Sequence, residues 1–243
     1  MTKTLTLIFV LFFILPVYLT ASNNIKEGDH AFIAMNYDRA IQYYLIDSSN
    51  SEAQWRAARA YICLADISTG EKRQKLISFA EKSARRSIQL NNLNANGHSW
   101  LAIALGNKAM YEGSRSKVAL CNEIKKELDI ALQLNPRDDL SYSVLGTFYR
   151  ALGKISWFER TLAKAFLGGV PAGGFKESEA ALKKAILYSP ETIRHWYELA
   201  LLYQDWGNED QKVKAYKKVC ALKIQVASDV NRLKASREAI NNI

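Results

Sequence analysis

The 243-residue sequence contains few of the residues that interrupt regular structure, with 12 glycines and 4 prolines. It also lacks runs of valine, isoleucine and threonine, which are typical of strands. All-β domains need many tight turns, where glycine and proline are the usual residues. These absences exclude an all-β domain and favour helices. The content of 49% hydrophobic and 23% charged residues is that of an ordinary globular protein.

Residues that carry out catalysis or bind metals are also few and scattered. The three histidines show no ligand spacing, and the three cysteines (Cys63, Cys121 and Cys220) form no CxxC pair. We therefore expect no metal site, and thiols that are free and buried. The glycines of "LGGVPAGGF" are not followed by the Lys-Ser/Thr of a phosphate loop.

One short motif has a weak likeness to a nucleophile elbow. In "GHS", Gly97–Ser99, the second glycine of the elbow is replaced by Leu101, and the segment lies within an expected helix rather than after a strand. A hydrolase is thus only a weak alternative. We expect no catalytic residue, no cofactor and no enzyme activity.

The first 22 residues form a separate segment. Lys3 precedes an apolar run from Leu5 to Leu19, and small residues follow it at positions 20–22. This order is typical of a signal peptide, which predicts a protein that is exported, periplasmic or secreted. The alternative is an uncleaved membrane anchor over residues 5–19. A single helical domain is expected over residues 23–243.

Internal repeats give the strongest signal in the sequence. "ALQLNPRDDLSYSVLGTFYRALG" (131–153) and "AILYSPETIRHWYELALLYQDWGN" (185–208) resemble each other, and two fainter copies precede them. The pattern resembles the tetratricopeptide repeat. Its small-residue positions are spaced by 30, 44, 44 and 54 residues, against about 34 for this repeat, and they are Gly28, Ala58, Ala102, Gly146 and Ala200.

The repeats predict an all-α fold, a tetratricopeptide-like α-solenoid of about five degenerate helix pairs. A capping helix over about 225–240 should place Val226, Val230, Leu233 and Ile240 on one face. The expected helix pairs are 25–34 with 37–47, 52–66 with 73–90, 95–109 with 116–134, 139–152 with 176–188, and 193–206 with 209–223.

The longest spacing marks an insertion in the fourth repeat, "ISWFERTLAKAFLGGVPAGGF" at 155–175. We expect an extra helix from Ser156 to about Leu167, wedged between the two helices of that repeat. An apolar face should pack on the array, and the charged residues should face outward or pair with each other. The apolar residues are Trp157, Phe158, Leu162 and Phe166, and the charged ones are Glu159, Arg160 and Lys164.

Several segments resemble the regulator of microtubule dynamics family in order and spacing. They are "WRAARAY" with "GEKR", "GHSWLAI", "YEGSRSKVA" and the inserted "SWFERTLAKAF…P", within residues 55–190. The resemblance implies an all-helical interaction domain rather than an enzyme. It also implies protein or lipid partners, because some members act as tethers at organelle membranes. The leader suggests an exported, bacterial-type relative.

A helical solenoid presents a concave groove lined mainly by the first helix of each pair. Side chains that follow the small positions at helical spacing should turn toward this groove, and we expect them to bind a partner. The alternative is that they are only exposed to solvent. They are Arg59, Asn107, Thr147, Arg150, Tyr197, Leu201 and Gln204. Such a groove suits an extended acidic peptide or a C-terminal carboxylate. The leading hypothesis is a non-enzymatic scaffold that binds a protein or peptide, and the alternative is a lipid-binding or membrane-tethering module.

Charge is unevenly distributed, with a formal net charge of +9. Between Gln211 and Glu238, eight lysines and arginines face two acidic residues, which leaves +6. A solvated helix face explains this as well as an acidic partner or an anionic membrane does. No nucleic-acid partner is expected. In "YEGSRSK", an ion pair of Glu112 with Arg115 or Lys117 is expected to fix a turn between two helices.

Overall fold

The computed structural model describes residues 23–242, and this part of the chain is helical without a strand. A first helix covers residues 23–33. The later helices are α2 (Tyr37–Ile46), α3 (Ser51–Asp66), α4 (Gly70–Leu90), α5 (Ala95–Ala109), α6 (Ser114–Leu134), α7 (Asp139–Gly153), α8 (Trp157–Leu167), α9 (Phe175–Tyr188), α10 (Ile193–Trp206), α11 (Glu209–Ala221) and α12 (Asp229–Asn241). The leader lies outside the described residues.

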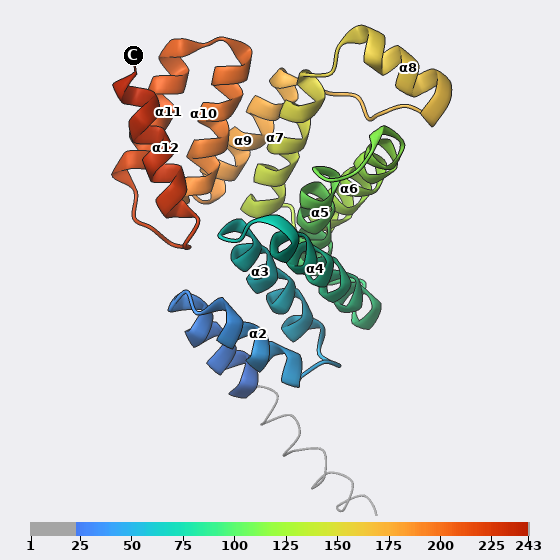
Figure 1. The fold of residues 1–243 in the computed structure, drawn as a ribbon, viewed down its shortest axis with the longest axis vertical. Helices are drawn as coiled ribbons and strands as arrows, with labels where there is room; N and C mark the ends of the chain where they lie inside the picture. Colours follow the sequence, from blue (N-terminus) through green and yellow to red (C-terminus); the bar gives the residue numbers. More distant parts are fainter. Residues whose placement is uncertain (1–22, 243) are drawn as a thin grey trace, which may run out of the picture.

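The helices form a curved stack of antiparallel pairs, which is the predicted α-solenoid (Figure 1). The pairs are the first helix with α2, α3 with α4, α5 with α6, α7 with α9, and α10 with α11, while α12 covers the last pair. Helix starts follow local sequence signals. Asn36, Asn50, Asn94 and Asn208 each accept a hydrogen bond from a backbone N–H of the first turn that follows them.

The small-residue positions lie where the paired helices pack against each other. All five are buried. A Cβ at Gly28 would overlap the ring of Tyr44, and one at Gly146 would overlap the Leu182 side chain. Tyr44 and Leu182 belong to the second helix of their pairs and are fully buried. The first helix therefore supplies the gap and the second helix the side chain that fills it.

The largest apolar cluster lies in the middle of the stack. It joins α3 to α7 through residues such as Trp55, Trp100, Leu105, Leu128 and Phe148. Smaller apolar clusters form the cores at the first and at the last repeats. Each pair thus buries its apolar faces against its neighbours, as expected of a repeat array.

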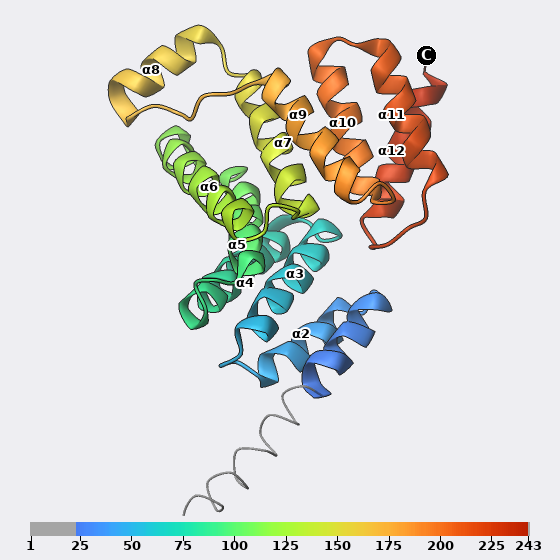
Figure 2. The ribbon, with the colours of Figure 1, turned by 180° about the vertical axis from the view of Figure 1, so that it is seen from behind.

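The inserted helix α8 differs from the prediction in its packing. It is not wedged between α7 and α9, which contact each other directly, but projects from the stack beside α6 (Figures 1 and 2). None of its residues is buried, so the prediction that Trp157, Phe158, Leu162 and Phe166 pack on the array is wrong. The small glycine and serine contacts of α7 with α9 leave no room between them for a third helix.

The charged residues of α8 also differ from their expected positions. Glu159 and Ser156 form a capping box at the helix start. Arg160 does not face outward, because its guanidinium donates to the carbonyl oxygens of Leu152 and Gly173. Lys164 is exposed, as predicted.

The C-terminal helix begins four residues later than predicted. The Asp229 carboxylate accepts from the backbone N–H groups of Gln225 (3.0 Å) and Val226 (3.1 Å), which fixes the preceding turn. Leu233 is buried and Val226 and Ile240 contact the apolar clusters, but Val230 is 54% exposed, so its predicted place on the buried face is wrong. Among the thiols, which are free, only Cys63 is buried, and burial raises its pKa to about 12.

A buried histidine joins α5 to α6. His98 Nδ1 lies 2.6 Å from a carboxylate oxygen of Glu127, and its Nε2 lies 2.9 Å from the Asn92 carbonyl oxygen. Burial alone would lower the pKa of His98, but these hydrogen bonds outweigh it, and the pKa is raised. With acceptors at both nitrogens, the ring donates twice as an imidazolium.

We predict that His98→Gln destabilises the protein at pH 6 by about 1.5–3 kcal/mol, the range for hydrogen bonds to charged groups. Because the folded pKa is raised, the contribution is complete below the unfolded value of about 6.5 and is lost as the pH rises through the folded pKa. Urea unfolding of both proteins at pH 6 and pH 9 measures the difference. A difference that stays constant between these pH values would contradict the assignment.

A second prediction concerns the close contact at Gly146. Gly146→Ala should destabilise the protein by about 1–3 kcal/mol, since the added methyl group overlaps the buried Leu182 side chain. Gly106→Ala is the matched control, because a methyl group added at Gly106 of α5 meets no other atom and should gain roughly 1 kcal/mol of helix propensity. Thermal unfolding should move in opposite directions for the two variants, and equal shifts would rule out the contact as the cause.

Candidate functional site

The concave side of the stack holds a half-enclosed groove of about 490 Å³. Helices α3, α5, α6, α7, α10 and α12 line it. Its floor is apolar and includes Ile62, Ile103, Ile124, Val144 and Phe148. Five charged side chains also line it, namely Lys117 of α6 and, from α3, α10 and α12, Asp66, Arg194, Glu198 and Arg232. We call this site the concave groove.

The groove is partly closed because the two ends of the solenoid meet. The Ala227 backbone N–H donates to the Tyr37 hydroxyl at 2.9 Å, across 190 positions of sequence. Val226 and Ala227 pack on the apolar cluster of the first repeats, and Arg232 of α12 lies 3.8 Å from Asp66 of α3. Figures 1 and 2 show the loop before α12 turned toward the first repeats. This closure turns an open concave face into a pocket.

Most charges around the groove have a partner within the chain. Arg232 pairs with Asp229 at 2.8 Å, and Glu198 pairs with Arg150 at 3.1 Å. Asp66 lies between Arg73 (3.9 Å) and Arg232 (3.8 Å). These pairs hold neighbouring helices together and leave little free charge in the wall.

Arg194 is different. It forms no ion pair within the described part of the chain, and its buried Nε has no hydrogen-bond partner there. Burial lowers the pKa of Arg194, and the nearby Arg232 adds to the effect, whereas Glu198 and Asp66 oppose it. Arginine keeps its charge under such shifts because its ordinary pKa is above 12. An unpaired cation therefore faces an apolar groove.

The nominated residues are divided among three places. Asn107 and Thr147 line the concave groove, where Asn107 accepts from Arg73 at 3.2 Å and Thr147 donates to the Ser143 carbonyl at 3.1 Å. Arg59 lies in the first repeats, where it pairs with Asp29 at 3.2 Å and stacks over Phe32.

The remaining nominated residues belong to α7 and α10. Arg150 forms ion pairs with Glu198 and with Asp205 (3.2 Å). Tyr197 packs beside Tyr216, whose hydroxyl donates to Gln204 at 3.1 Å, and Leu201 is half-buried. The structure thus places Asn107 and Thr147 in the concave groove and engages Arg59, Arg150, Tyr197 and Gln204 in contacts elsewhere in the chain. Partner binding by these seven residues stays a prediction.

The charged wall of the groove was not expected from the sequence. Arg194 and Glu198 lie four residues apart on one face of α10, with Asp205 seven further on, and this charged stripe was readable in the sequence. Arg232 and Asp66 were not readable as neighbours. Their approach depends on the curvature of the whole array, which no local pattern encodes.

The "GHS" segment does not form a catalytic pair. The Ser99 hydroxyl donates to the Ala95 carbonyl or to the Asp138 carboxylate, whereas His98 turns to Glu127. A serine nucleophile needs a base within hydrogen-bond reach, and His98 is engaged elsewhere. Within residues 23–242, no group of three or more His, Cys, Asp or Glu side chains could hold a metal ion.

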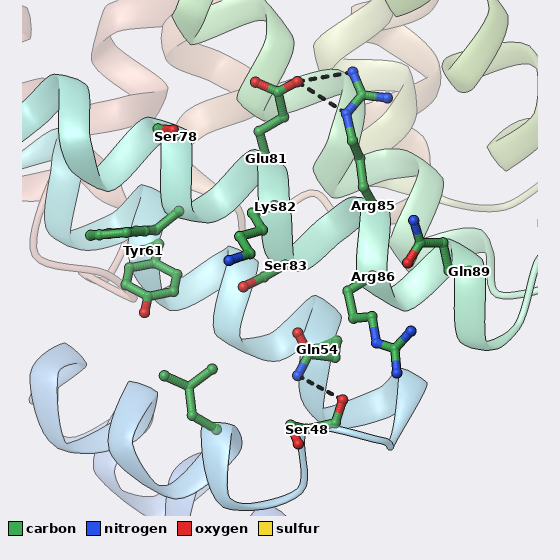
Figure 3. Close-up of a pocket in the computed structure, with 12 residues that line it drawn as sticks. Ser48, Gln54, Tyr61, Ser78, Glu81, Lys82, Ser83, Arg85, Arg86 and Gln89 are labelled. Atoms are coloured by element: carbon green, nitrogen blue, oxygen red, sulfur yellow. Dashed lines mark hydrogen bonds and ion pairs between the residues drawn. The ribbon is translucent and has the colours of Figure 1, made fainter.

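A second cleft lies on the convex side, between α2, α3 and α4 (Figure 3). It measures about 720 Å³, and its lining includes Tyr61 and Phe79, whose ring centroids lie 5.5 Å apart. Arg85 points toward Glu81, to which it donates at 2.9 Å, and it also pairs with Glu123 at 2.8 Å. The cleft is larger than the concave groove, but its buried charge is paired. The concave groove is therefore the better candidate.

The arrangement defines the class of protein as a tetratricopeptide-like α-solenoid, a helical repeat scaffold. A solved structure of this kind is that of a thermophilic tetratricopeptide-repeat protein from Thermus thermophilus. It aligns with a TM-score of 0.67 over 91% of this chain and 99% of that chain, at 19% identity. At this identity the likeness shows the fold alone.

The chain belongs to the family described as Regulator of microtubule dynamics protein 1-3, whose model matches residues 24–243. It is 30% identical to Regulator of microtubule dynamics protein 1 of Bos taurus over 59% of this chain and 46% of that protein. It is 27% identical to Regulator of microtubule dynamics protein 2 of Rattus norvegicus over 81% of this chain and 48% of that protein. The chain thus spans about half the length of the curated relatives it matches. The family resemblance drawn from the sequence is confirmed.

The closing contact of the groove yields a prediction. Tyr37→Phe should speed amide hydrogen exchange at residues 225–228 by about fivefold, because the Ala227 N–H loses its acceptor and a net hydrogen bond contributes about 1 kcal/mol. Tyr43→Phe on the same helix is the control, since its hydroxyl accepts only from Arg39. Exchange that is unchanged in Tyr37→Phe would mean that the contact does not hold the ends together.

Proposed function

We propose that this chain is a non-enzymatic scaffold that binds a segment of a partner protein in the concave groove. The fold supports this proposal, because helical solenoids use their extended concave surfaces for recognition. Away from the helix ends the backbone groups are hydrogen-bonded within each helix, so recognition on the concave face depends on side-chain chemistry.

The observation that carries the proposal is the unpaired guanidinium of Arg194 in a half-enclosed apolar groove. The Arg194 side chain is half-buried and its Nε is buried without a partner, which carries a desolvation cost that an incoming anion offsets. Arginine matches a carboxylate with two parallel hydrogen bonds. We infer that the partner segment brings an acidic side chain or a C-terminal carboxylate to Arg194 and lays an apolar side chain on the floor.

Asn107 and Thr147 face the same groove from α5 and α7. Asn107 Oδ1 and Thr147 Oγ1 each form one hydrogen bond within the chain and keep a lone pair, so we infer that they accept from the backbone N–H groups of an extended segment. Such a segment would be recognised through its charge at one end and its apolar side chains along its length. Arg194 would then set the orientation of the bound segment, and Asn107 and Thr147 would set its register along the groove.

We predict that Arg194→Met weakens binding of acidic peptides at least about tenfold, since truncating one partner of a buried charge pair costs about 2 kcal/mol or more. The probe is a panel of fluorescently labelled decapeptides, made in pairs with a free C-terminal carboxylate or an amide and with Glu or Gln side chains. Fluorescence anisotropy measures their dissociation constants. The pairs separate recognition of the terminus from recognition of side chains.

Arg86→Met is the matched control, because Arg86 is exposed on α4 at the convex cleft and does not line the groove. It should bind the peptides as the unmodified chain does. Equal losses in both variants would reduce the effect to general attraction by the net charge of +9. Binding that is indifferent to peptide charge and to Arg194 would overturn the proposal.

A further inference from the structure

The projecting helix α8 exposes an apolar face that no described part of the chain covers. Phe158, Leu162 and Phe166 follow one another at a spacing of four residues, which places them on one side of the helix. They are 62%, 41% and 75% exposed, and Trp157 at the helix start is 79% exposed. Large aromatic side chains grouped in this way mark an interaction site.

The opposite side of α8 fixes the helix to the body. Arg160, Ala163 and Leu167 are half-buried, at spacings of three and four residues. The Arg160 guanidinium donates to the carbonyl oxygens of Leu152 and Gly173, the latter at 2.9 Å, and so ties α8 to the end of α7 and to the return loop. The capping box and the left-handed Gly168 (φ 82°) define both helix ends. The apolar face is therefore presented outward by a supported helix.

A second apolar element lies at the same end of the molecule. The turn between α5 and α6 carries Met110 and Tyr111, which are 76% and 47% exposed. Figures 1 and 2 both show this turn at the end of α6 nearest to α8, and Asn122 of α6 donates to the Gly169 carbonyl just after α8 at 3.4 Å. We call α8 and the turn of residues 110–113 the docking edge.

The docking edge has a cationic border. Arg115, Lys117 and Lys164 are exposed and form no ion pair within the described part of the chain, so the expected pairing of Glu112 at this turn is absent. Glu159, the acidic residue of α8, is held in the capping box, where its hydrogen bonds to Ser156 lower its pKa. The three cations Arg115, Lys117 and Lys164 thus outnumber the carboxylates of Glu112 and Glu159, and the balance of charge at this edge is positive.

We propose that the docking edge inserts its aromatic side chains into the interface of an anionic lipid bilayer. Tryptophan and phenylalanine beside lysine and arginine are the composition of helices that lie in the membrane interface. Each cation near an anionic surface adds attraction, which neutral lipids do not supply. The charge complementarity therefore favours an anionic bilayer as the occupant. Met110 and Lys117 of the docking edge also line the concave groove, but the proposal does not require a peptide to bind there.

Tryptophan fluorescence tests the proposal on the full chain. The probes are vesicles of phosphatidylcholine, alone or mixed with phosphatidylglycerol, that carry lipids brominated near the top of the acyl chain. Bromine quenches a tryptophan that enters the interface. The apolar run of residues 5–19 contains no tryptophan, so quenching does not report on that run. We expect quenching in the anionic vesicles that Trp157→Phe abolishes and that Trp206→Phe, at another exposed tryptophan, leaves in place.

A pair of double variants tests the apolar stripe itself. Phe158→Ser with Phe166→Ser should lower the quenching of Trp157 in anionic vesicles to its value in neutral ones. Leu93→Ser with Leu187→Ser is the matched control, because these leucines are 71% and 73% exposed away from the docking edge. In this control variant the Trp157 fluorescence should be quenched as strongly as in the unmodified chain. Circular dichroism and thermal unfolding confirm that all variants fold.

Three outcomes overturn the proposal. One is quenching that persists in Trp157→Phe, and a second is equal quenching in neutral and anionic vesicles. The third is a dimer in light scattering that the Phe158→Ser, Phe166→Ser variant loses, because the docking edge would then serve a second copy of the chain.

Discussion

The close approach of the two helices in each pair is the constraint on which the rest of the structure depends. At Gly28 and Gly146 the first helix has no side chain, and the second helix fills the space with Tyr44 or Leu182. Ala58, Ala102 and Ala200 have the same position and are fully buried. This contact fixes the distance and angle between the helices, and the angle repeated along the array gives the curvature. The concave groove exists only because that curvature continues through the whole array.

Local sequence patterns predicted the helices and the pairs because their causes are local. Small residues, caps and apolar periodicity act within one or two helices, and so the boundaries agree closely except at α12, where the Asp229 side chain reorganises the preceding turn. The packing of α8 was not predictable from its periodicity. An apolar stripe indicates that a helix has a partner, but it does not say whether the partner lies within the chain.

The candidate site shows the same limit. Asn107 and Thr147 were placed in the groove by counting from Ala102 and Gly146, because that count follows helix geometry. Arg59 and Arg150 have the same spacing from their small residues, but they form ion pairs within the chain, Arg59 with Asp29 and Arg150 with Glu198 and Asp205. Whether a charged side chain is free depends on neighbours from other repeats. Arg194 is available because no such neighbour reaches it within the described residues.

The meeting of Tyr37 with Ala227 has a consequence for how this fold can change. An open solenoid is modular, and a repeat added or removed at either end alters its length without disturbing the others. Here the first and last repeats touch through Tyr37 with Ala227 and Asp66 with Arg232, so these contacts depend on the number of helix pairs between them. Gain or loss of one pair would move both ends out of register and open the groove. The number of repeats is thus fixed by the whole fold. Insertions such as α8 lengthen the chain without changing the contact between the first and last repeats.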